Sequence, residues 1–209
     1  DQADSERQPL PKPDTRLGYL PLGVVGVFAA SNFPLAFSTA GGDTASALAA
    51  GCPVIMKAHA AHPGTAELVA RAISHAITLC EIDVGVFSLI QGKNYAISSQ
   101  IVTHPFIKAV GFTGSERVGM ILQQQINQRA EPIPFYGELG SVNPQFILAN
   151  KLNEDAEQIA QALVASLMMA QGQFCTSPGI WAVIENETSG NVVKRFIETA
   201  AAAIDNTVA

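Results

Sequence analysis

One segment of the chain places a thiol where a substrate could reach it. Cys175 lies among glycine and small polar residues at the end of a predicted helix, in the segment 172–176, GQFCT. A thiolate is a strong nucleophile once nearby donors or a general base stabilise it. A single cysteine is more often a small buried hydrophobic residue, so this segment alone leaves both interpretations open.

A carboxylate with unusual neighbours is the second candidate. Glu138 lies in the segment 135–140, FYGELG, between glycines and apolar residues. Such flanks predict a desolvated carboxyl, and burial raises the pKa of a carboxyl toward the range useful for a general base. Taken alone, an exposed or ion-paired glutamate in a loop is the more common explanation.

An amide and a glycine-containing turn follow two of the predicted strands. Asn32 follows the strand expected at 24–29, where parallel sheets place ligand sites. Its side-chain amide could donate a hydrogen bond to an oxyanion. A turn-forming asparagine is the alternative. Gly114 and Ser115, in the segment 111–115, GFTGS, follow another strand and open a helix. The N–H groups of such a helix start suit a phosphate, although the signal is weak by itself.

The elements that must position these residues alternate between strand and helix. Apolar periodicity predicts strands at 24–29, 53–57, 86–90 and 108–112, and helices at 43–50, 65–80, 95–103 and 115–128. This alternation predicts right-handed crossovers and a Rossmann-like, doubly wound parallel α/β sheet.

The pattern changes after Glu131, where Pro132 and Pro134 predict a junction near residue 137. Beyond it we expect strands at 146–148 and 180–184 and helices at 155–170 and 191–204. This second part, about seventy residues, is short for an α/β domain, so we expect it to be incomplete. We expect the first sixteen residues to form an arm or linker.

Composition excludes several classes of protein. The 209 residues are 48% apolar and 14% charged with a net charge of −6, which favours a large core and disfavours a nucleic-acid or membrane surface. Three widely spaced cysteines favour a reducing, cytoplasmic compartment. The uncharged stretch 17–42 is broken by prolines and polar residues, so we predict no membrane span. His59 and His62 lack the spacing of a zinc site, so we predict no metal.

Five motifs occur together in one order. They are residues 32–34 (NFP), Lys57, 112–115 (FTGS), 138–140 (ELG) and 172–175 (GQFC). In this order and approximate spacing they resemble the aldehyde dehydrogenase superfamily, from Leu17 to Ala209. A joint match is far more specific than any single motif.

The resemblance implies a role for each matched residue. Cys175 corresponds to the nucleophile that forms a thiohemiacetal and then a thioester, and Asn32 to the amide that stabilises the oxyanion. Glu138 corresponds to the base that activates water for hydrolysis. Lys57 corresponds to the contact with the adenosine ribose, and Ser115, with Gly114 before it, to the contact with the pyrophosphate. The implied domains are dinucleotide-binding over 17–136 and partial catalytic over 137–209.

Finer details resemble the bacterial branch that acts on 2-oxoglutarate semialdehyde and fatty aldehydes. They are the segments 59–65 (HAAHPGT), 131–140 (EPIPFYGELG) and 141–144 (SVNP). NAD-preferring members carry a glutamate where this chain has Ala60, so we expect NADP to bind, with NAD possible. The resemblance also implies a homodimer or homotetramer and a small aldehyde as substrate.

Two alternatives remain at this stage. Family members are longer than this chain, so it could be a truncated, non-catalytic dinucleotide-binding piece. An acylating dehydrogenase or acyl-phosphate reductase of the same fold is the other, although those enzymes do not need the hydrolytic carboxylate, and Glu138 is present.

Overall fold

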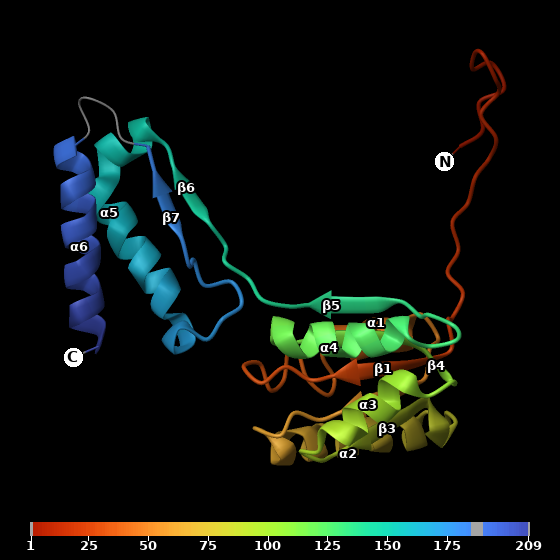
Figure 1. Cartoon of the computed structure of the whole chain (residues 1–209). Helices are drawn as coiled ribbons and strands as arrows, with labels where there is room; N and C mark the ends of the chain where they lie inside the picture. Colours follow the sequence, from red (N-terminus) through yellow and green to blue (C-terminus); the bar gives the residue numbers. More distant parts are fainter. Residues whose placement is uncertain (1, 185–189, 209) are drawn as a thin grey trace. The chain divides into compact units, whose positions relative to one another are not determined.

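The computed structural model describes residues 2–184 and 190–208. It contains two compact units, Asp1–Leu139 and Gly140–Ala209, and each is described by itself. Figure 1 labels most of the helices and strands of both units. Residues 2–23 form no helix or strand, apart from one bridge between Asp4 and Lys12.

A five-stranded parallel sheet forms the centre of the first unit. Its strands are β1 (Val24–Phe28), β2 (Val54–Lys57), β3 (Phe87–Ile90), β4 (Ile107–Thr113) and β5 (Phe135–Glu138). They lie in the order β3-β2-β1-β4-β5, and every neighbouring pair is parallel. From β1 the chain adds β2 and β3 on one side, and it then crosses back to add β4 on the other side of β1. Rossmann-like folds bind their ligands at the carboxyl ends of the strands around that point.

Helices cover both faces of this sheet. They are α1 (Gly42–Ala49), α2 (Pro63–Leu79), α3 (Tyr95–Thr103) and α4 (Glu116–Asn127), with a short 3₁₀ turn, η1, at Val84–Val86. One core joins α1 and α2 to the sheet through residues such as Val27, Met56 and Ile77. A second core joins α3 and α4 to the sheet through residues such as Val102, Val110 and Leu122. The predicted doubly wound arrangement is therefore confirmed.

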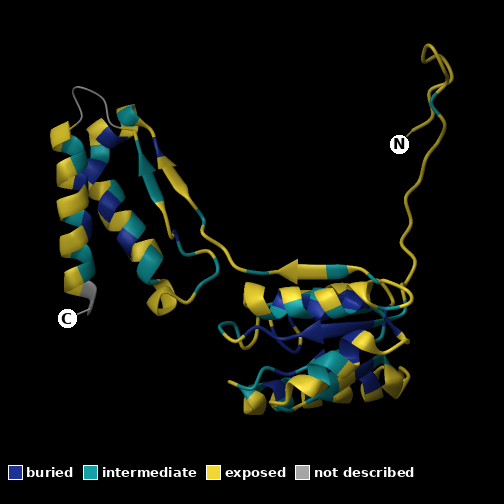
Figure 2. Cartoon of the chain, viewed as in Figure 1, coloured by how far each residue is buried: buried dark blue, intermediate teal, exposed yellow. Residues whose placement is uncertain are grey.

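Strand β1 shows why the sequence produces two cores. Val25 and Val27 belong to one core and Phe28 to the other, because successive side chains of a strand point to opposite faces. Figure 2 shows β1 buried over most of its length. A strand buried on both faces needs the continuous apolar run that residues 24–28 provide.

Strand β5 differs from the prediction, which places no strand there. Phe135 pairs with Val110, and Glu138 pairs with Thr113. Pro134 immediately precedes the strand, and its carbonyl oxygen accepts a hydrogen bond from the Val110 N–H at 3.0 Å. The first unit consequently ends at Leu139, slightly beyond the junction expected near residue 137.

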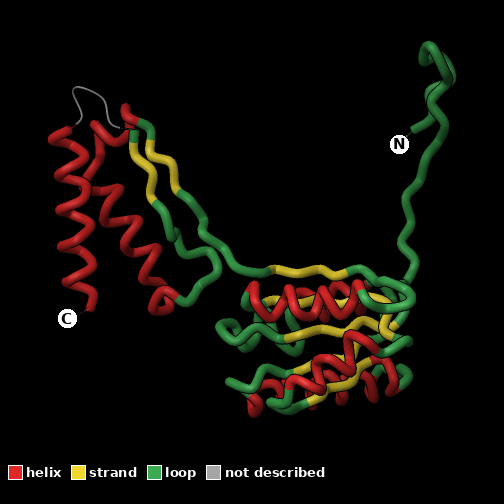
Figure 3. The backbone as a smooth tube through the Cα atoms, in the orientation of Figure 1, coloured by secondary structure: helices red, strands yellow, loops and turns green. Residues whose placement is uncertain are grey.

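The second unit packs two helices against a small parallel sheet. Strands β6 (Gln145–Ile147) and β7 (Trp181–Val183) pair, and α5 (Ala149–Met168), the 3₁₀ turn η2 (Met169–Gly172) and α6 (Gly190–Val208) complete it. Figure 3 shows α5 and α6 side by side. Leu152, Ala156, Ala160 and Val164 recur every four residues on α5 and form its core face.

Helix α5 begins earlier than the predicted range of 155–170. Asp155 has non-helical backbone angles, so α5 consists of two helical segments that meet there. The prediction covers the second segment only. Among the described residues, no helix is long and apolar enough to cross a membrane.

Candidate functional site

A cavity of about 290 Å³ lies at the carboxyl ends of β1, β2 and β4. Three of the predicted cofactor residues, Lys57, Gly114 and Ser115, line it together. The other lining residues are Phe28, Ala29, Ser31, Ala58, His59, Ser98, Phe112, Thr113, Val118 and Leu122. One ammonium, one imidazole and several hydroxyls therefore face the cavity, and none of these lining residues is acidic.

Lys57 is the last residue of β2 and is half-buried. Burial lowers the pKa of its ammonium below the usual range. Among the described residues it has no hydrogen-bond or ion-pair partner. A half-buried ammonium without a counter-ion favours a ligand that brings oxygen acceptors or negative charge.

The start of α4 fits a phosphate-bearing ligand. Ser115 caps this twelve-residue helix but makes no side-chain capping hydrogen bond, so its hydroxyl is not used in the cap. The Gly114 N–H donates to the Glu138 carbonyl at 3.0 Å, which joins the turn to β5. A Cβ on Gly114 would lie 2.8 Å from Phe112 Cζ, so a larger residue would have to displace the Phe112 ring. The positive end of the helix dipole also faces this region.

His59 lines the cavity, whereas the predicted residue Ala60 does not. His59 Nδ1 accepts a hydrogen bond from the Ala61 N–H at 3.1 Å. Burial, then the charges of His62 and Lys57, lower the pKa of His59. From the sequence, His59 is a rejected metal ligand and part of the segment 59–65 that resembles one branch. Its place two residues after Lys57 is a signal that could have identified it as a cavity residue.

Asn32 lies in the loop between β1 and α1 and is half-buried. The loop folds back on itself, since the Ala30 N–H donates to the Phe37 carbonyl at 2.9 Å. Phe33 and Phe37 pack edge to face, with ring centroids 5.0 Å apart. Ser31, but not Asn32, is among the residues that line the cavity.

Glu138 ends β5, and its side chain is exposed, so the expected desolvation is wrong for this chain. Flanking glycines and apolar residues do not bury a side chain unless another element covers it. Glu138 lines a second cavity of about 270 Å³ with Asp43 and Thr113. Burial, and then the charge of Glu138, raise the pKa of Asp43, a titratable neighbour that sequence analysis missed.

Cys175 belongs to the second unit, in the loop between η2 and β7, and is half-buried. The preceding residues Ala170, Gln171 and Gly172 all have positive φ, between 47° and 71°. Two non-glycine residues in this conformation are strained, and such strain is frequent at functional sites.

Two side chains from the segment before β6 hold the loop of Cys175. The Ser141 hydroxyl donates to the Cys175 carbonyl oxygen. Asn143 Nδ2 donates to the same oxygen at 2.5 Å and to the Ser177 carbonyl at 3.1 Å. In the sequence this segment indicates only a resemblance to one branch, and nothing there predicts these contacts.

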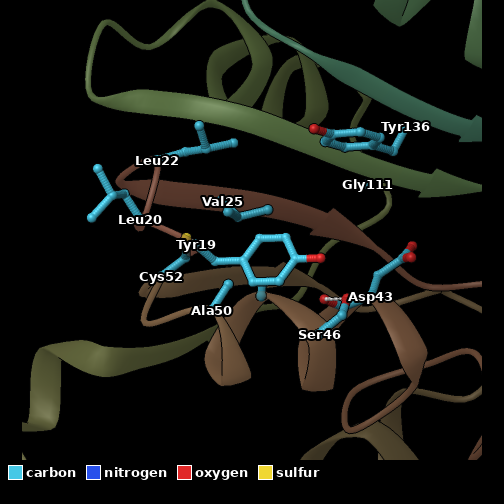
Figure 4. Close-up of a pocket in the computed structure, with 11 residues that line it drawn as sticks. Tyr19, Leu20, Leu22, Val25, Asp43, Ser46, Ala50, Cys52, Gly111 and Tyr136 are labelled. Atoms are coloured by element: carbon cyan, nitrogen blue, oxygen red, sulfur yellow. Dashed lines mark hydrogen bonds between the residues drawn. The ribbon is translucent and has the colours of Figure 1, made fainter. Parts of the chain in front are cut away.

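A third cavity, of about 530 Å³, involves none of the predicted site residues. Figure 4 shows Tyr19 and Tyr136 among its lining residues, with Ser46 donating to the Asp43 backbone carbonyl. Its wall is mainly apolar and includes Cys52, Val25 and Ala50. Within the described residues, no group of three or more His, Cys, Asp or Glu side chains could hold a metal ion.

The parallel sheet and the cavity at its carboxyl edge define a Rossmann-like α/β protein. A model of the aldehyde dehydrogenase family matches residues 2–207, and the chain belongs to this family.

Curated relatives include two alpha-ketoglutaric semialdehyde dehydrogenases, from Azospirillum brasilense (51% identical) and Acinetobacter baylyi (48% identical). Each alignment covers 98% of this chain but only 38% of the relative's length. The chain therefore spans well under half of these relatives.

Solved structures give the same fold. An aldehyde dehydrogenase from Bartonella henselae is 26% identical with a TM-score of 0.72, and covers 88% of this chain and 35% of its own. A glyceraldehyde-3-phosphate dehydrogenase from Methanocaldococcus jannaschii, complexed with NADP, is 27% identical with a TM-score of 0.70. The match covers 88% of this chain and 37% of that protein. An aldehyde dehydrogenase from Pseudomonas syringae, complexed with NAD+ and octanal, is 25% identical with a TM-score of 0.73. That match covers 88% of this chain and 35% of the other protein.

Proposed function

We propose that the natural protein carrying this chain oxidises an aldehyde to a carboxylic acid with a nicotinamide dinucleotide. The observation that carries the proposal is the presence of Cys175, Asn32 and Glu138 in a chain that matches the family over residues 2–207. Each residue type suits one step of this reaction. A thiol attacks, an amide stabilises negative charge, and a carboxylate activates water.

The residues of the chain divide the reaction into acylation and hydrolysis. The Cys175 thiolate attacks the aldehyde carbon and forms a thiohemiacetal, while the Asn32 amide donates to its oxygen. Loss of hydride from this intermediate leaves a thioester on Cys175. Glu138 then removes a proton from water, which attacks the thioester and releases the acid and the thiol. A hydrolytic carboxylate favours this reaction over an acylating dehydrogenase or acyl-phosphate reductase.

A nicotinamide dinucleotide supplies the hydride acceptor when it is bound. We propose that Lys57 donates to the hydroxyls of its adenosine ribose and that Ser115 and the start of α4 bind its pyrophosphate. The support is the ammonium of Lys57, which has no partner in the described part of the chain, and the Ser115 hydroxyl, which is not used in the helix cap; both face one cavity. Relatives solved with NAD+ and with NADP support the class of cofactor.

The similarity to these relatives supports 2-oxoglutarate semialdehyde, also called alpha-ketoglutaric semialdehyde, as the substrate. Two of them, at 51% and 48% identity, are alpha-ketoglutaric semialdehyde dehydrogenases. A fatty aldehyde is the second candidate, since a long-chain-aldehyde dehydrogenase from Acinetobacter is 31% identical. Comparing kcat/KM for these two aldehydes in the natural protein tests this assignment, and a preference for the fatty aldehyde would overturn it.

The test of the nucleophile is Cys175→Ala in the natural protein that carries this chain. We expect loss of dehydrogenase activity with an unchanged circular dichroism spectrum. Cys80→Ala, which changes an exposed cysteine at the end of α2, is the matched control and should retain activity. Activity that survives Cys175→Ala would refute the assignment.

The test of the base is Glu138→Gln. Acylation does not need this carboxylate, so a burst of about one equivalent of reduced cofactor per site should persist while steady turnover falls about 10²-fold. Equal losses of burst and steady rate would instead assign Glu138 to acylation.

The cofactor preference that we propose is NADP at least as good as NAD. Ala60 places no carboxylate near the end of β2, where a glutamate would repel a 2′-phosphate. Ala60→Glu should therefore weaken NADP selectively in a titration of both cofactors. A tenfold or greater preference for NAD in the unmodified protein would contradict this interpretation of Ala60.

A second function is favoured by the chain's short span relative to its relatives. The cavity around Lys57 and Ser115 lies wholly within the first unit. The 209 residues alone could thus bind a dinucleotide without turnover. Calorimetric titration of the 209-residue chain with NAD and NADP, beside an assay of aldehyde oxidation, separates binding from catalysis.

A further inference from the structure

We propose that His59 recognises the 2′-phosphate of NADP and takes up a proton when that phosphate binds. The inference rests on the proposed binding of a nicotinamide dinucleotide in the cavity at the ends of β1, β2 and β4. It adds a specificity-determining side chain that none of the five sequence motifs contains. It also adds a proton whose uptake can be measured without any catalysis.

The position of His59 supports the 2′-phosphate as its ligand. In Rossmann-like folds the residues that follow the second strand contact the ribose 2′ position. His59 is two residues beyond Lys57, the last residue of β2, and lines the same cavity. The start of α4, which suits the pyrophosphate, follows β4 on the other side of β1. The two phosphate-binding regions therefore belong to different strand ends.

The surroundings of His59 keep its ring neutral until a ligand arrives. Its Nδ1 accepts from the Ala61 N–H, so the proton of the neutral ring resides on Nε2, which is a donor. Burial and the charges of His62 and Lys57 all disfavour a protonated ring. Among the described residues, His62 and Lys57 are the charged groups that lower its pKa, and none of the residues that line the cavity is acidic.

A phosphate dianion reverses this balance. Its charge adjacent to the ring favours imidazolium, and the Ala61 N–H, on an exposed residue, can turn to water when Nδ1 takes the proton. His62 cannot substitute easily. Its Nε2 lies 2.8 Å from the Ala30 carbonyl, and its Nδ1 is buried without a partner among the described residues.

The experiment is calorimetric titration of the 209-residue chain with NADP and NAD, each in two buffers of different ionisation enthalpy. Between about pH 7 and 9 the 2′-phosphate is already a dianion, so its own ionisation contributes little. We expect proton uptake with NADP, little with NAD, and NADP affinity that falls as pH rises. Equal proton uptake for the two cofactors would overturn the proposal, and this arm requires no variant.

Variants separate His59 from Lys57, whose pKa is also lowered. His59→Gln should weaken NADP by about tenfold, the scale of one charge-assisted hydrogen bond, and leave NAD within about twofold. It should also abolish the excess proton uptake, whereas His59→Arg should abolish the uptake but retain NADP affinity. His75→Gln, on an exposed residue of α2, is the matched control and should change nothing.

The outcomes distinguish this inference from the proposed function. If neither dinucleotide binds the chain, the cavity assignment fails and His59 fails with it. If both bind but His59→Gln lowers their affinities equally, or not at all, the dinucleotide site stands and the role of His59 is refuted.

Discussion

At the scale of single residues, type and spacing predict chemistry better than environment. The motifs predict Lys57, Gly114 and Ser115 as cofactor residues, and these three line one cavity. Glu138 was expected to be buried, yet it is exposed, because burial depends on which other elements cover a strand end. Local sequence could not reveal Asp43, since the loop, helix and strands between residues 43 and 138 bring its carboxyl close to Glu138.

The elevated pKa of Asp43 predicts a stability effect with a definite sign. The folded state binds the Asp43 proton more tightly than the unfolded state, so this carboxyl favours folding at low pH. That contribution is lost as pH rises through the folded-state pKa. Asp43→Asn should therefore be more stable than the unmodified chain at neutral pH, by up to about 1 kcal/mol for a half-exposed group, and the gain should vanish in acid.

Urea denaturation at several pH values measures this difference. The exposed Asp14, which pairs with Arg16, provides the matched control Asp14→Asn. Glu138→Gln should reduce the gain from Asp43→Asn, because part of the shift comes from the charge of Glu138. A loss of stability in Asp43→Asn at neutral pH would contradict the prediction.

Asn143 carries a prediction about the Cys175 loop. Its side chain donates to the carbonyls of Cys175 and Ser177, and its φ of 48° is one that glycine also tolerates. Asn143→Gly therefore removes the donors without adding backbone strain. We expect a loss of about 1–2 kcal/mol in unfolding free energy and faster labelling of Cys175 by a thiol reagent. Asn153→Ala, an exposed change on α5, should alter neither.

At the scale of elements, apolar periodicity predicts the helices and strands that are buried by packing. Helix α3 has the predicted bounds, and β1 and α1 differ by a residue, because their apolar patterns reflect burial directly. Strand β5 was missed because Pro132, Pro134 and Gly137 are typical of a junction. As an edge strand it needs few apolar residues, so its pairing with β4 leaves little trace in the sequence.

One side chain joins three elements of the first unit. The Arg129 guanidinium donates to the carbonyls of Val102, His104 and Ile107 at 2.7–3.0 Å, and also to the Glu131 carbonyl at 3.1 Å. It thereby links the segment after α4 to the end of α3 and the start of β4. Only a planar fork of donors satisfies so many acceptors at once.

Arg129→Lys should therefore destabilise the first unit by about 2 kcal/mol, because one ammonium cannot replace the donors to all four carbonyls, of which those of Val102 and Ile107 are part-buried. Chemical denaturation followed by far-ultraviolet circular dichroism measures the change. Arg71→Lys is the matched control. Within the described residues Arg71 makes only an exposed pair with Glu67, so its substitution should cost less than about 0.5 kcal/mol. Equal effects of the two substitutions would show that the guanidinium contacts contribute no stability.

At the scale of the whole molecule, the candidate functions divide between the two units. The first has two cores on either side of its sheet, and the second has a separate core between α5, α6 and its own strands. Every residue that lines the proposed dinucleotide cavity belongs to the first unit, while the proposed nucleophile Cys175 belongs to the second. Binding and chemistry should therefore be separable by truncation.

A chain ending at Leu139 should fold and bind NADP within about twofold of the 209-residue chain, because the truncation removes no residue of the cavity or of the first unit's cores. A chain ending at Pro134 is the informative comparison. It lacks β5, whose Phe135 packs on the core beneath α3 and α4 and whose Glu138 carbonyl accepts from Gly114. This shorter chain should be less stable and bind NADP more weakly, since the turn before α4 loses its anchor. Titration calorimetry and thermal denaturation of the two chains measure both effects. If removing residues 140–209 abolished NADP binding in a chain that still folds, the cavity of the first unit would not be the dinucleotide site.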